Sequence, residues 1–155
     1  MDWKTLFFSA EGRIGRSTFW IGWLVLLGVN VVLGWVPLLG WLLSLVTIYC
    51  WVCVSAKRLH DMGKSGWLTI IPMVFAWVIP LVALVAFGGA TIFAGLADLD
   101  DNATAMAVLS SLGGMLLIVL VSWLVAFVFL IWQGVTDGVA GENRFGPPPA
   151  QPAVA

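Results

Sequence analysis

The stretch KRLHDMGKSGW (residues 57–67) holds three of the seven basic residues of the chain, its only histidine and one of its eight acids. Sequence free of charge lies on both sides of it, over residues 19–56 and 67–97. The chain as a whole is 61% hydrophobic and 10% charged, whereas about a quarter of the residues of soluble domains are charged. This arrangement predicts a short polar loop between two membrane-spanning segments.

Four apolar stretches are long enough to cross a bilayer. The hydrocarbon core is about 30 Å thick, and a helix needs about 20 mostly apolar residues to span it. Spanning segments are helical because a backbone in lipid must satisfy its own hydrogen bonds. We therefore predict an all-α fold, a bundle of four transmembrane helices over about residues 19–36, 38–56, 67–95 and 108–134.

Two of these stretches are longer than one crossing requires. The charge-free run over residues 67–97 has 31 residues, and the run before Asp137 has 35. We expect the excess to continue as helix beyond the membrane on the outer side. Pro72 and Pro80 lie in the third stretch, and proline removes a backbone donor and clashes with the preceding turn. We therefore expect the third helix to be kinked, or to begin only after Pro72.

Residues 1–147 are expected to form one membrane domain, since a length near 150 residues suggests a single domain. The first residues, MDWKTLFF, place Trp3, Leu6 and Phe7 at helical spacing. This spacing favours a short interfacial helix on the cytoplasmic membrane surface. The proline-rich residues 148–155 lack an apolar period, and we expect them to be a disordered tail.

Basic residues gather on one predicted side of the membrane. With four spans, the segments before the first helix, between the second and third, and after the fourth share one side. These segments carry all seven basic residues: Lys4, Arg13, Arg16, Lys57, Arg58, Lys64 and Arg144. The opposite side receives residues 98–102, DLDDN, with three acids and no basic residue. Positive loops stay in the cytoplasm, so both termini and the 57–67 loop are predicted to be cytoplasmic.

Two motifs of the 57–67 loop match known sites only in part. GKSG (residues 63–66) is similar to the end of a phosphate-binding loop, but Arg58 occupies the position of the required upstream glycine. His60-Asp61 is similar to a metal-binding pair of phosphohydrolases, but a single imidazole would hold a metal weakly. We therefore predict no metal and no cofactor. Asp61 is expected to accept hydrogen bonds from Arg58, Lys64 or loop amides.

The predicted cytoplasmic face has the features of an anion site. The first and third predicted helices begin there, and Ser17 and Ser65 are positioned to cap them. Helix starts are partly positive and bind anions, and basic cytoplasmic pockets bind lipid head groups. The candidate residues, in an anion-binding or a structural role, are Arg13, Arg16, Arg58, His60, Asp61, Lys64, Ser65, Asn143 and Arg144. The alternative is that their charge only fixes the topology and contacts lipid without specificity.

Three blocks occur in order along the chain: GRIGRSTFW (residues 12–20), AKRLHDMGKSGW (residues 56–67) and GENRFGP (residues 141–147). They resemble the signature blocks of the YhaH-like family, small bacterial inner-membrane proteins that share a domain of unknown function, number eight-zero-five. The resemblance implies an integral protein of the bacterial inner (cytoplasmic) membrane, and it implies no settled biochemical activity.

The three blocks coincide with the predicted cytoplasmic segments, so we expect them to meet in the fold. Asp61 would then pair with Arg13, Arg16 or Arg144. Asn143 would cap a helix or tie down the tail.

Neither composition nor motif names a reaction or a substrate. The net charge of −1 gives no electrostatic argument for nucleic acid. The first hypothesis is a non-enzymatic membrane protein whose basic cytoplasmic face binds anionic membrane lipids or a protein partner, with a homo-oligomer as one form. The second is a small oligomeric transporter or channel, which needs several copies because four short helices give little material for a pore. The third is a membrane enzyme acting on a lipid phosphate, with His60 and Asp61 as acid–base pair.

A reporter fused after Pro147 tests the predicted topology. An even number of spans places this residue on the same side as Lys4 and Arg58. A reporter that works only in the cytoplasm is therefore expected to be active, and one that works only in the periplasm to be silent. The opposite pattern would remove the common basic face.

Overall fold

The computed structural model describes residues 2–36, 39–96 and 101–149, and these residues form helices and connecting loops without a strand. The predicted all-α fold is thus confirmed, and four helices are long and apolar enough to cross a membrane. The described chain divides into two compact units, residues 2–69 with 131–149 and residues 70–130.

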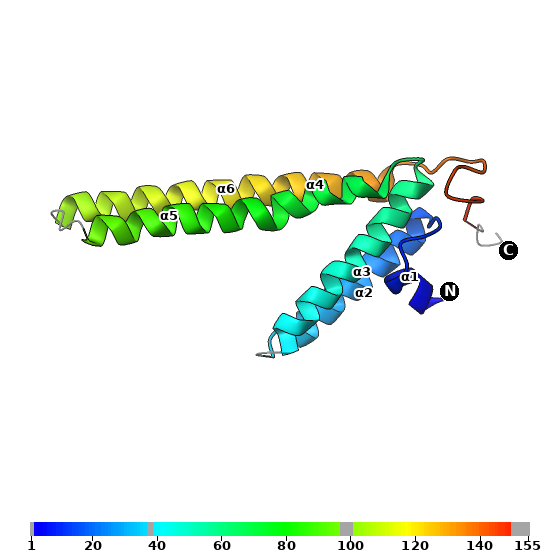
Figure 1. Ribbon diagram of the computed structural model, residues 1–155, viewed down its shortest axis with the longest axis horizontal. Helices are drawn as coiled ribbons and strands as arrows, with labels where there is room; N and C mark the ends of the chain where they lie inside the picture. The colour runs from blue at the N-terminus through cyan, green and yellow to red at the C-terminus, as the bar shows by residue number, and fades with distance from the viewer. Residues whose placement is uncertain (1, 37–38, 97–100, 150–155) are drawn as a thin grey trace. The chain divides into compact units, whose positions relative to one another are not determined.

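The first unit is built on a pair of antiparallel helices, α2 (Arg16–Leu33) and α3 (Leu39–Asp61), which pack along one another (Figure 1). α2 begins three residues before its predicted start at residue 19, with Gly15 in an extended conformation as its N-cap. α3 continues five residues beyond its predicted end at residue 56. Apolar sequence marks only the part of a helix that suits lipid, whereas the helix itself continues where its charged side chains find partners.

The short N-terminal helix α1 (Trp3–Phe8) packs against α3 in the same unit (Figure 1). Asp2 is its N-cap and accepts a hydrogen bond from the Lys4 N–H at 3.1 Å. Leu6 is buried, and the Lys57 ammonium of α3 donates to the backbone carbonyls of Thr5 and Leu6. The predicted helix is therefore present, and its location on a membrane surface stays a prediction.

The end of α3 is fixed by glycine at one position. Gly63 has φ +70°, in the left-handed region. The Gly63 N–H donates to the His60 carbonyl at 3.0 Å, and the Lys64 N–H donates to the Leu59 carbonyl at 2.8 Å. This pair of bonds is the Schellman motif, which requires a residue that tolerates positive φ. The glycine of the sequence motif GKSG thus ends a helix.

The third apolar stretch is helical from Gly66 onward. It begins with the 3₁₀ turn η1 (Gly66–Thr69), which still belongs to the first unit. The elements that follow are α4 (Ile70–Met73), the π turn η2 (Val74–Val78) and α5 (Ile79–Leu96). Helical residues thus precede Pro72. The π turn comes directly before Pro80, where the Ile79 N–H bonds to the Val74 carbonyl five residues back. This wider turn accommodates the bond that proline cannot make.

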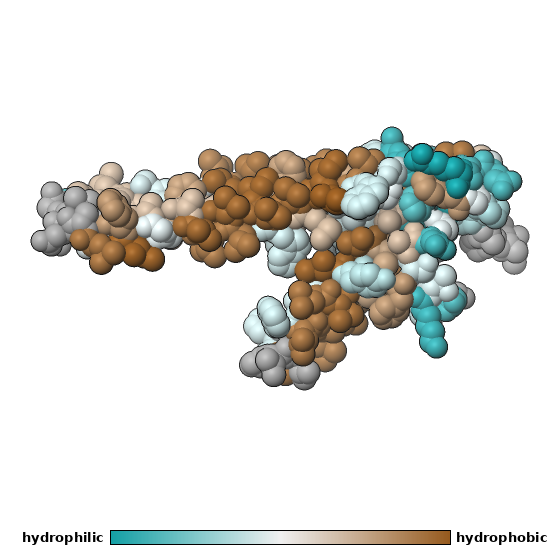
Figure 2. Space-filling view, viewed as in Figure 1, coloured by the Kyte–Doolittle hydropathy of each residue, from teal (hydrophilic) through white to brown (hydrophobic). Residues whose placement is uncertain are grey.

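The second unit consists of α4, η2, α5 and most of α6 (Asp101–Val135). α5 and α6 run side by side (Figure 1), and a Cβ at Gly114 of α6 would lie 3.0 Å from the Phe87 ring of α5. α6 begins seven residues before its predicted start at residue 108, so the expected helical excess is present. Most large apolar side chains of the unit are exposed, and Figure 2 shows the brown surface along both helices.

Three predicted features lie wholly or partly outside the described residues. They are the turn at Pro37, the acidic segment over residues 98–102 and the tail over residues 148–155.

Replacing Gly63 by alanine tests the helix end. Alanine at φ +70° is expected to lower the free energy of unfolding by about 1–2 kcal/mol, because its Cβ meets the following carbonyl oxygen. The matched control is Gly28→Ala in α2, where a Cβ has open space and φ is not positive. Thermal unfolding in detergent would measure both, and equal stabilities of the two variants would contradict the assignment.

Candidate functional site

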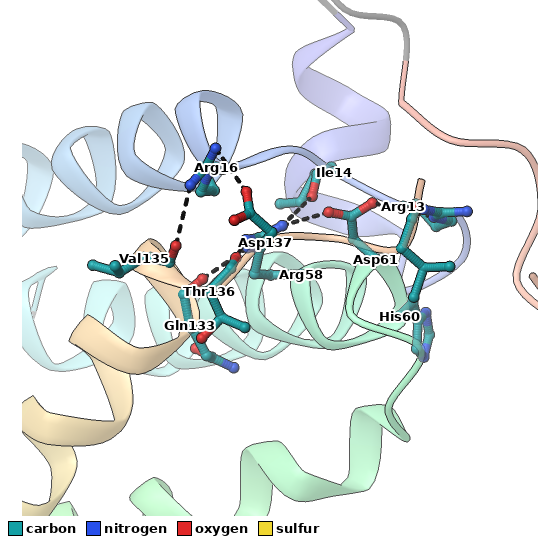
Figure 3. Close-up of polar contacts among 12 residues, drawn as sticks. Arg13, Ile14, Arg16, Arg58, His60, Asp61, Gln133, Val135, Thr136 and Asp137 are labelled. Carbon is teal, nitrogen blue, oxygen red and sulfur yellow. Dashed lines mark hydrogen bonds and ion pairs between the residues drawn. The ribbon is translucent and has the colours of Figure 1, made fainter. Parts of the chain in front are cut away.

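The C-terminal end of α6 is capped by side chains from α2 and α3. The last four carbonyls of a helix have no partner within the helix. Here the donors are Arg58 Nε to the Gln133 carbonyl (2.8 Å), Trp20 Nε1 to the Gly134 carbonyl (3.2 Å) and Arg16 Nη1 to the Val135 carbonyl (3.2 Å). Two of these donors are cationic, which also suits the partly negative end of a helix. Figure 3 shows Arg16 and Arg58 reaching this end from their own helices.

Arg58 is the central residue of this arrangement, and 1% of its side chain is exposed. Besides the bond to Gln133, it donates to the carbonyls of Thr136 and Ile14 and to the Asp61 carboxylate (Figure 3). A buried charge is tolerated only when it is paired and hydrogen-bonded. The guanidinium therefore joins α3, the α6 end and the segment before α2 through bonds that it needs itself.

Asp61 lies between two guanidinium groups. Its Oδ1 accepts from Arg13 Nη2 at 3.0 Å and Nε at 3.2 Å, and its Oδ2 accepts from Arg58. The side chains of Arg13 and Asp61 are 1% and 5% exposed. We call Arg13, Arg58 and Asp61 the buried arginine cluster. It holds two positive charges and one negative charge, so backbone carbonyls must offset the remainder.

These carbonyls come from the loop after α6. Arg13 donates to the carbonyls of Gly141 (2.7 Å) and Gly146 (3.1 Å), and also to that of Val139. The Val139 N–H in turn donates to the Asp61 backbone carbonyl at 2.8 Å. The loop is thus bonded both to Arg13 and to the backbone of Asp61. Its carbonyl groups supply the acceptors that water would offer to an exposed guanidinium.

Two glycines permit this close approach, and the sequence analysis did not single them out. A Cβ at Gly138 would lie 2.1 Å from Asp61 Oδ2, and a Cβ at Gly134 would lie 2.3 Å from the Trp20 ring. Both distances are far inside van der Waals contact. The spacing of glycines around Asp137, in QGVTDGVAG (residues 133–141), is the signal that could have indicated an approach of backbone to side chains.

A buried polar pair was also missed. Ser55 of α3 and Gln133 of α6 are fully buried and bond to one another, with Gln133 Nε2 2.7 Å from Ser55 Oγ. Buried polar groups are hydrogen-bonded, and each supplies the partner of the other. Trp20 is a second residue whose role was not predicted, because its indole N–H donates to the Gly134 carbonyl at the end of α6.

The last block of the sequence packs on His60. The rings of His60 and Phe145 are stacked, with centroids 3.8 Å apart and planes 9° from parallel. Asn143 Nδ2 donates to the His60 carbonyl at 2.9 Å, and His60 Nδ1 lies 3.3 Å from the Gly12 carbonyl oxygen. Asn143 thus bonds a carbonyl in the last turn of α3 and holds the loop after α6 against that helix end.

The remaining candidate residues lie at the periphery. Arg16 pairs with Asp137 at 2.8 Å and not with Asp61, and both side chains are largely exposed. The Lys64 ammonium lies 5.6 Å from the centre of the Trp132 ring, and the Arg144 guanidinium lies 4.7 Å from that of Phe145. Three blocks far apart in sequence are thus brought together, but the nine residues do not converge on one anion-sized space.

The two serines expected to cap helices differ: Ser17 lies inside α2, whereas Ser65 lies directly before η1. Ser17 is the second residue of α2, whose N-cap is Gly15 without a side-chain bond. Ser65 precedes η1, and its backbone carbonyl accepts from the Leu68 N–H at 3.2 Å. α2 begins at Arg16, ahead of the apolar run from which its start was predicted.

The geometry indicates a structural role for the buried arginine cluster. Both carboxylate oxygens of Asp61 accept from arginine, and one face of the His60 ring is covered by Phe145. A general base must present a free lone pair to its substrate. The donors of Arg13 and Arg58 point at protein oxygens, so an external anion would have to displace these bonds.

Comparison with known proteins matches most of the chain to one family model. Residues 7–147 match the model of a family described as "Protein of unknown function (DUF805)". The chain belongs to this family. Two relatives named "Uncharacterized protein YiiR", from Escherichia coli strain K12 and Escherichia coli O157:H7, are 38% identical over 80 residues, which cover 46% of this chain and 53% of theirs. The chain thus spans about half the length of the curated relatives it matches, and no solved structure matches it.

The DUF805 region contains the whole buried arginine cluster and its partners. Arg13, Asp61 and Gly146 come from the first, second and third sequence blocks and lie within the matched residues. Family membership adds no activity to this geometry.

A double-mutant cycle tests the cluster. Asp61→Asn is expected to lower the free energy of unfolding by about 3–5 kcal/mol, because it leaves two buried guanidinium groups without a carboxylate. Arg13→Gln leaves Asp61 paired with Arg58 and is expected to cost less, about 1–3 kcal/mol, because Asp61 Oδ1 and the loop carbonyls lose their donors. The double variant should be less destabilised than the sum, since the two side chains share their bonds.

The matched control is the exposed pair Arg16 and Asp137. Its coupling is expected to stay below about 1 kcal/mol because solvent screens it. Unfolding of all variants would be followed by heat or denaturant in one detergent. Additive effects of Arg13→Gln and Asp61→Asn would refute the pairing.

Proposed function

We propose that this DUF805 protein is a non-enzymatic integral protein of the bacterial inner membrane whose basic cytoplasmic face binds anionic lipid head groups. Four long apolar helices support the membrane location. The observation that supports the lipid site is that some basic side chains are buried and others are exposed. Arg13 and Arg58 are buried and bonded within the protein, while Lys4, Arg16, Lys64 and Arg144 are exposed.

The position of the exposed cations supports the proposal. Arg16 begins α2, and Lys64 follows the end of α3. Lys64 lies over the Trp132 indole, and tryptophan favours the level of the head groups. A cation fixed beside an interfacial indole is placed where lipid phosphates lie. Juxtamembrane basic residues contribute about 1 kcal/mol each to attraction by an anionic surface.

The buried arginine cluster has a supporting role in this proposal. It joins the segments near the exposed cations, because Arg58 bonds to the end of α6 and Arg13 bonds to the following loop. The alternative enzyme with His60 and Asp61 as acid–base pair gains no support from the geometry, because both Asp61 oxygens are occupied by arginine.

Lipid retention by the purified protein tests the proposal. The triple variant Arg16→Gln, Lys64→Gln and Arg144→Gln is expected to lose preference for anionic over zwitterionic lipid by about 100-fold, from three charges of about 1 kcal/mol each. Native mass spectrometry after exchange in nanodiscs of phosphatidylglycerol and phosphatidylethanolamine would measure bound lipid.

The control variant keeps the charge at the same positions: Arg16→Lys, Lys64→Arg and Arg144→Lys. It should retain anionic lipid, because the attraction is proposed to rest on charge and location. Unchanged anionic preference in the glutamine variant would reject the lipid site.

A further inference from the structure

The N-terminal helix α1 is bonded to α3 at two positions along that helix. The Thr5 and Leu6 carbonyls of α1 accept hydrogen bonds from the Lys57 ammonium. The Phe8 carbonyl, at the end of α1, accepts one from the Tyr49 hydroxyl at 3.3 Å. Lys57 and Tyr49 lie eight residues apart in α3, which is about 12 Å along the helix. The Phe8 end of α1 therefore lies farther from the charged end of α3 than the Thr5 end does.

The Leu6 side chain shows where α1 lies along α2. Leu6 is buried, and a Cβ at Gly22 of α2 would lie 3.7 Å from Leu6 Cδ2 and 3.4 Å from Val54 Cγ1 of α3. Leu6 thus packs between the two helices at the level of Gly22. Gly22 comes six residues after Arg16, the first residue of α2, which is about 9 Å along the helix. α1 therefore packs beside the apolar part of the α2–α3 pair.

The length of this pair indicates how deep α1 lies in a membrane. The hydrocarbon core is about 30 Å thick. A boundary of the core at the level of Leu6 would leave residues 22–33 of α2 and residues 39–54 of α3 to cross it, about 18 Å and 24 Å of helix. α2 approaches the required thickness only when it is immersed from Arg16 onward, since its full length is about 27 Å. Leu6 then lies below the membrane surface.

The carbonyl groups at the end of α1 have the partners that such a position requires. The last four carbonyls of a helix have no partner within the helix, and water would satisfy them at an exposed helix end. Backbone groups in lipid must instead be satisfied by the protein. Three of the last four carbonyls of α1, those of Thr5, Leu6 and Phe8, accept from side chains of α3. This end of α1 is therefore suited to an environment without water.

The aromatic side chains of α1 continue the apolar surface of α3. Trp3 and Phe8 are 48% and 60% exposed. The Phe8 and Tyr49 rings have centroids 6.4 Å apart. Leu45 and Val46, about one turn from Tyr49 in the same candidate membrane span, are also exposed. The face of α1 thus joins the surface through which α3 would contact lipid.

We propose that α1 dips into the cytoplasmic leaflet with its Phe8 end deeper than its Trp3 end, and that acyl chains of this leaflet cover its aromatic face. A flat interfacial helix would instead have both ends at one depth. The charged residues Asp2 and Lys4 belong to the shallower end, where they reach the head groups. This inference rests on the membrane location and topology of the proposed function, and not on its head-group site.

Spin labels on the full chain test the depth of α1. Cys50 and Cys53 are buried and are first replaced by alanine. Separate variants then carry a nitroxide at Trp3→Cys or Phe8→Cys, in vesicles of phosphatidylglycerol and phosphatidylethanolamine. Collision rates with oxygen, which concentrates in lipid, and with a nickel chelate, which stays in water, report the depth of each label.

Two further labels calibrate these rates. Leu24→Cys, at a side chain of α2 that is 56% exposed, represents the hydrocarbon core. Glu142→Cys, in the exposed loop after α6, represents water. Both calibration positions lie in the first unit with α1.

The Phe8 label is expected to lie at least about 4 Å deeper than the Trp3 label, because the two positions are five residues, about 7.5 Å, apart along the helix. Its oxygen-to-nickel ratio should approach that of the Leu24 label. Equal depths would show a flat helix, and nickel access equal to that at Glu142 would show a helix in water. Protection of the Phe8 label from both reagents would show that protein covers it. Each of these three results overturns the proposal.

Photo-cross-linking of the unaltered protein gives a second measurement that needs no substitution. The probe is phosphatidylethanolamine with a diazirine near the end of one acyl chain. After irradiation, the tryptic peptide over residues 5–13 is expected to carry lipid, and the peptide that follows Arg144 to carry none. Absence of lipid on residues 5–13 would overturn the proposal even where a labelled variant had lost its fold.

These measurements distinguish a failure of this inference from a failure of the proposed function. Loss of the head-group site would appear in lipid retention by the glutamine variant and would leave the depth of Phe8 unchanged. Nickel access at Leu24 would refute the membrane location, on which both proposals rest.

Discussion

The unsatisfied carbonyl groups at the end of α6 impose the constraint on which the first unit depends. A helix that ends inside protein must find donors for its last carbonyls, and a buried guanidinium must find acceptors. Arg58 and the carbonyls of Gln133 and Thr136 meet both needs at once. Asp61 alone could not neutralise Arg13 and Arg58, so the backbone of the loop after α6 completes the site.

This constraint explains why polar residues cluster in a chain with so few of them. The three blocks that carry charge contribute one partner each to a single bonded set, in which Arg13, Asp61 and Gly146 are linked through the first guanidinium. Helical packing in lipid gains little from burying apolar surface, since lipid tails are as apolar as the side chains. Directional bonds at one end of the helices therefore contribute specificity that apolar packing does not supply.

The sequence predicted the helices well and the site incompletely. Apolar runs and charge placement indicated four spans and the meeting of three blocks, because both signals depend on residue type alone. The roles of Trp20, Ser55, Gly134 and Gly138 depend on which backbone atoms come near them, and a single sequence does not contain that information. For the same reason Arg13 and Arg58 looked like ligands for an external anion, whereas their donors face carbonyls of the chain itself.

The late position of the loop after α6 has a consequence for biosynthesis. The acceptors for Arg13 at Val139, Gly141 and Gly146 leave the ribosome long after the arginine itself. Until then, the nascent chain carries the Arg13 guanidinium without its loop acceptors. The site therefore closes only after residue 146 has been synthesised, and a chain truncated before residue 139 would leave Arg13 without these three acceptors.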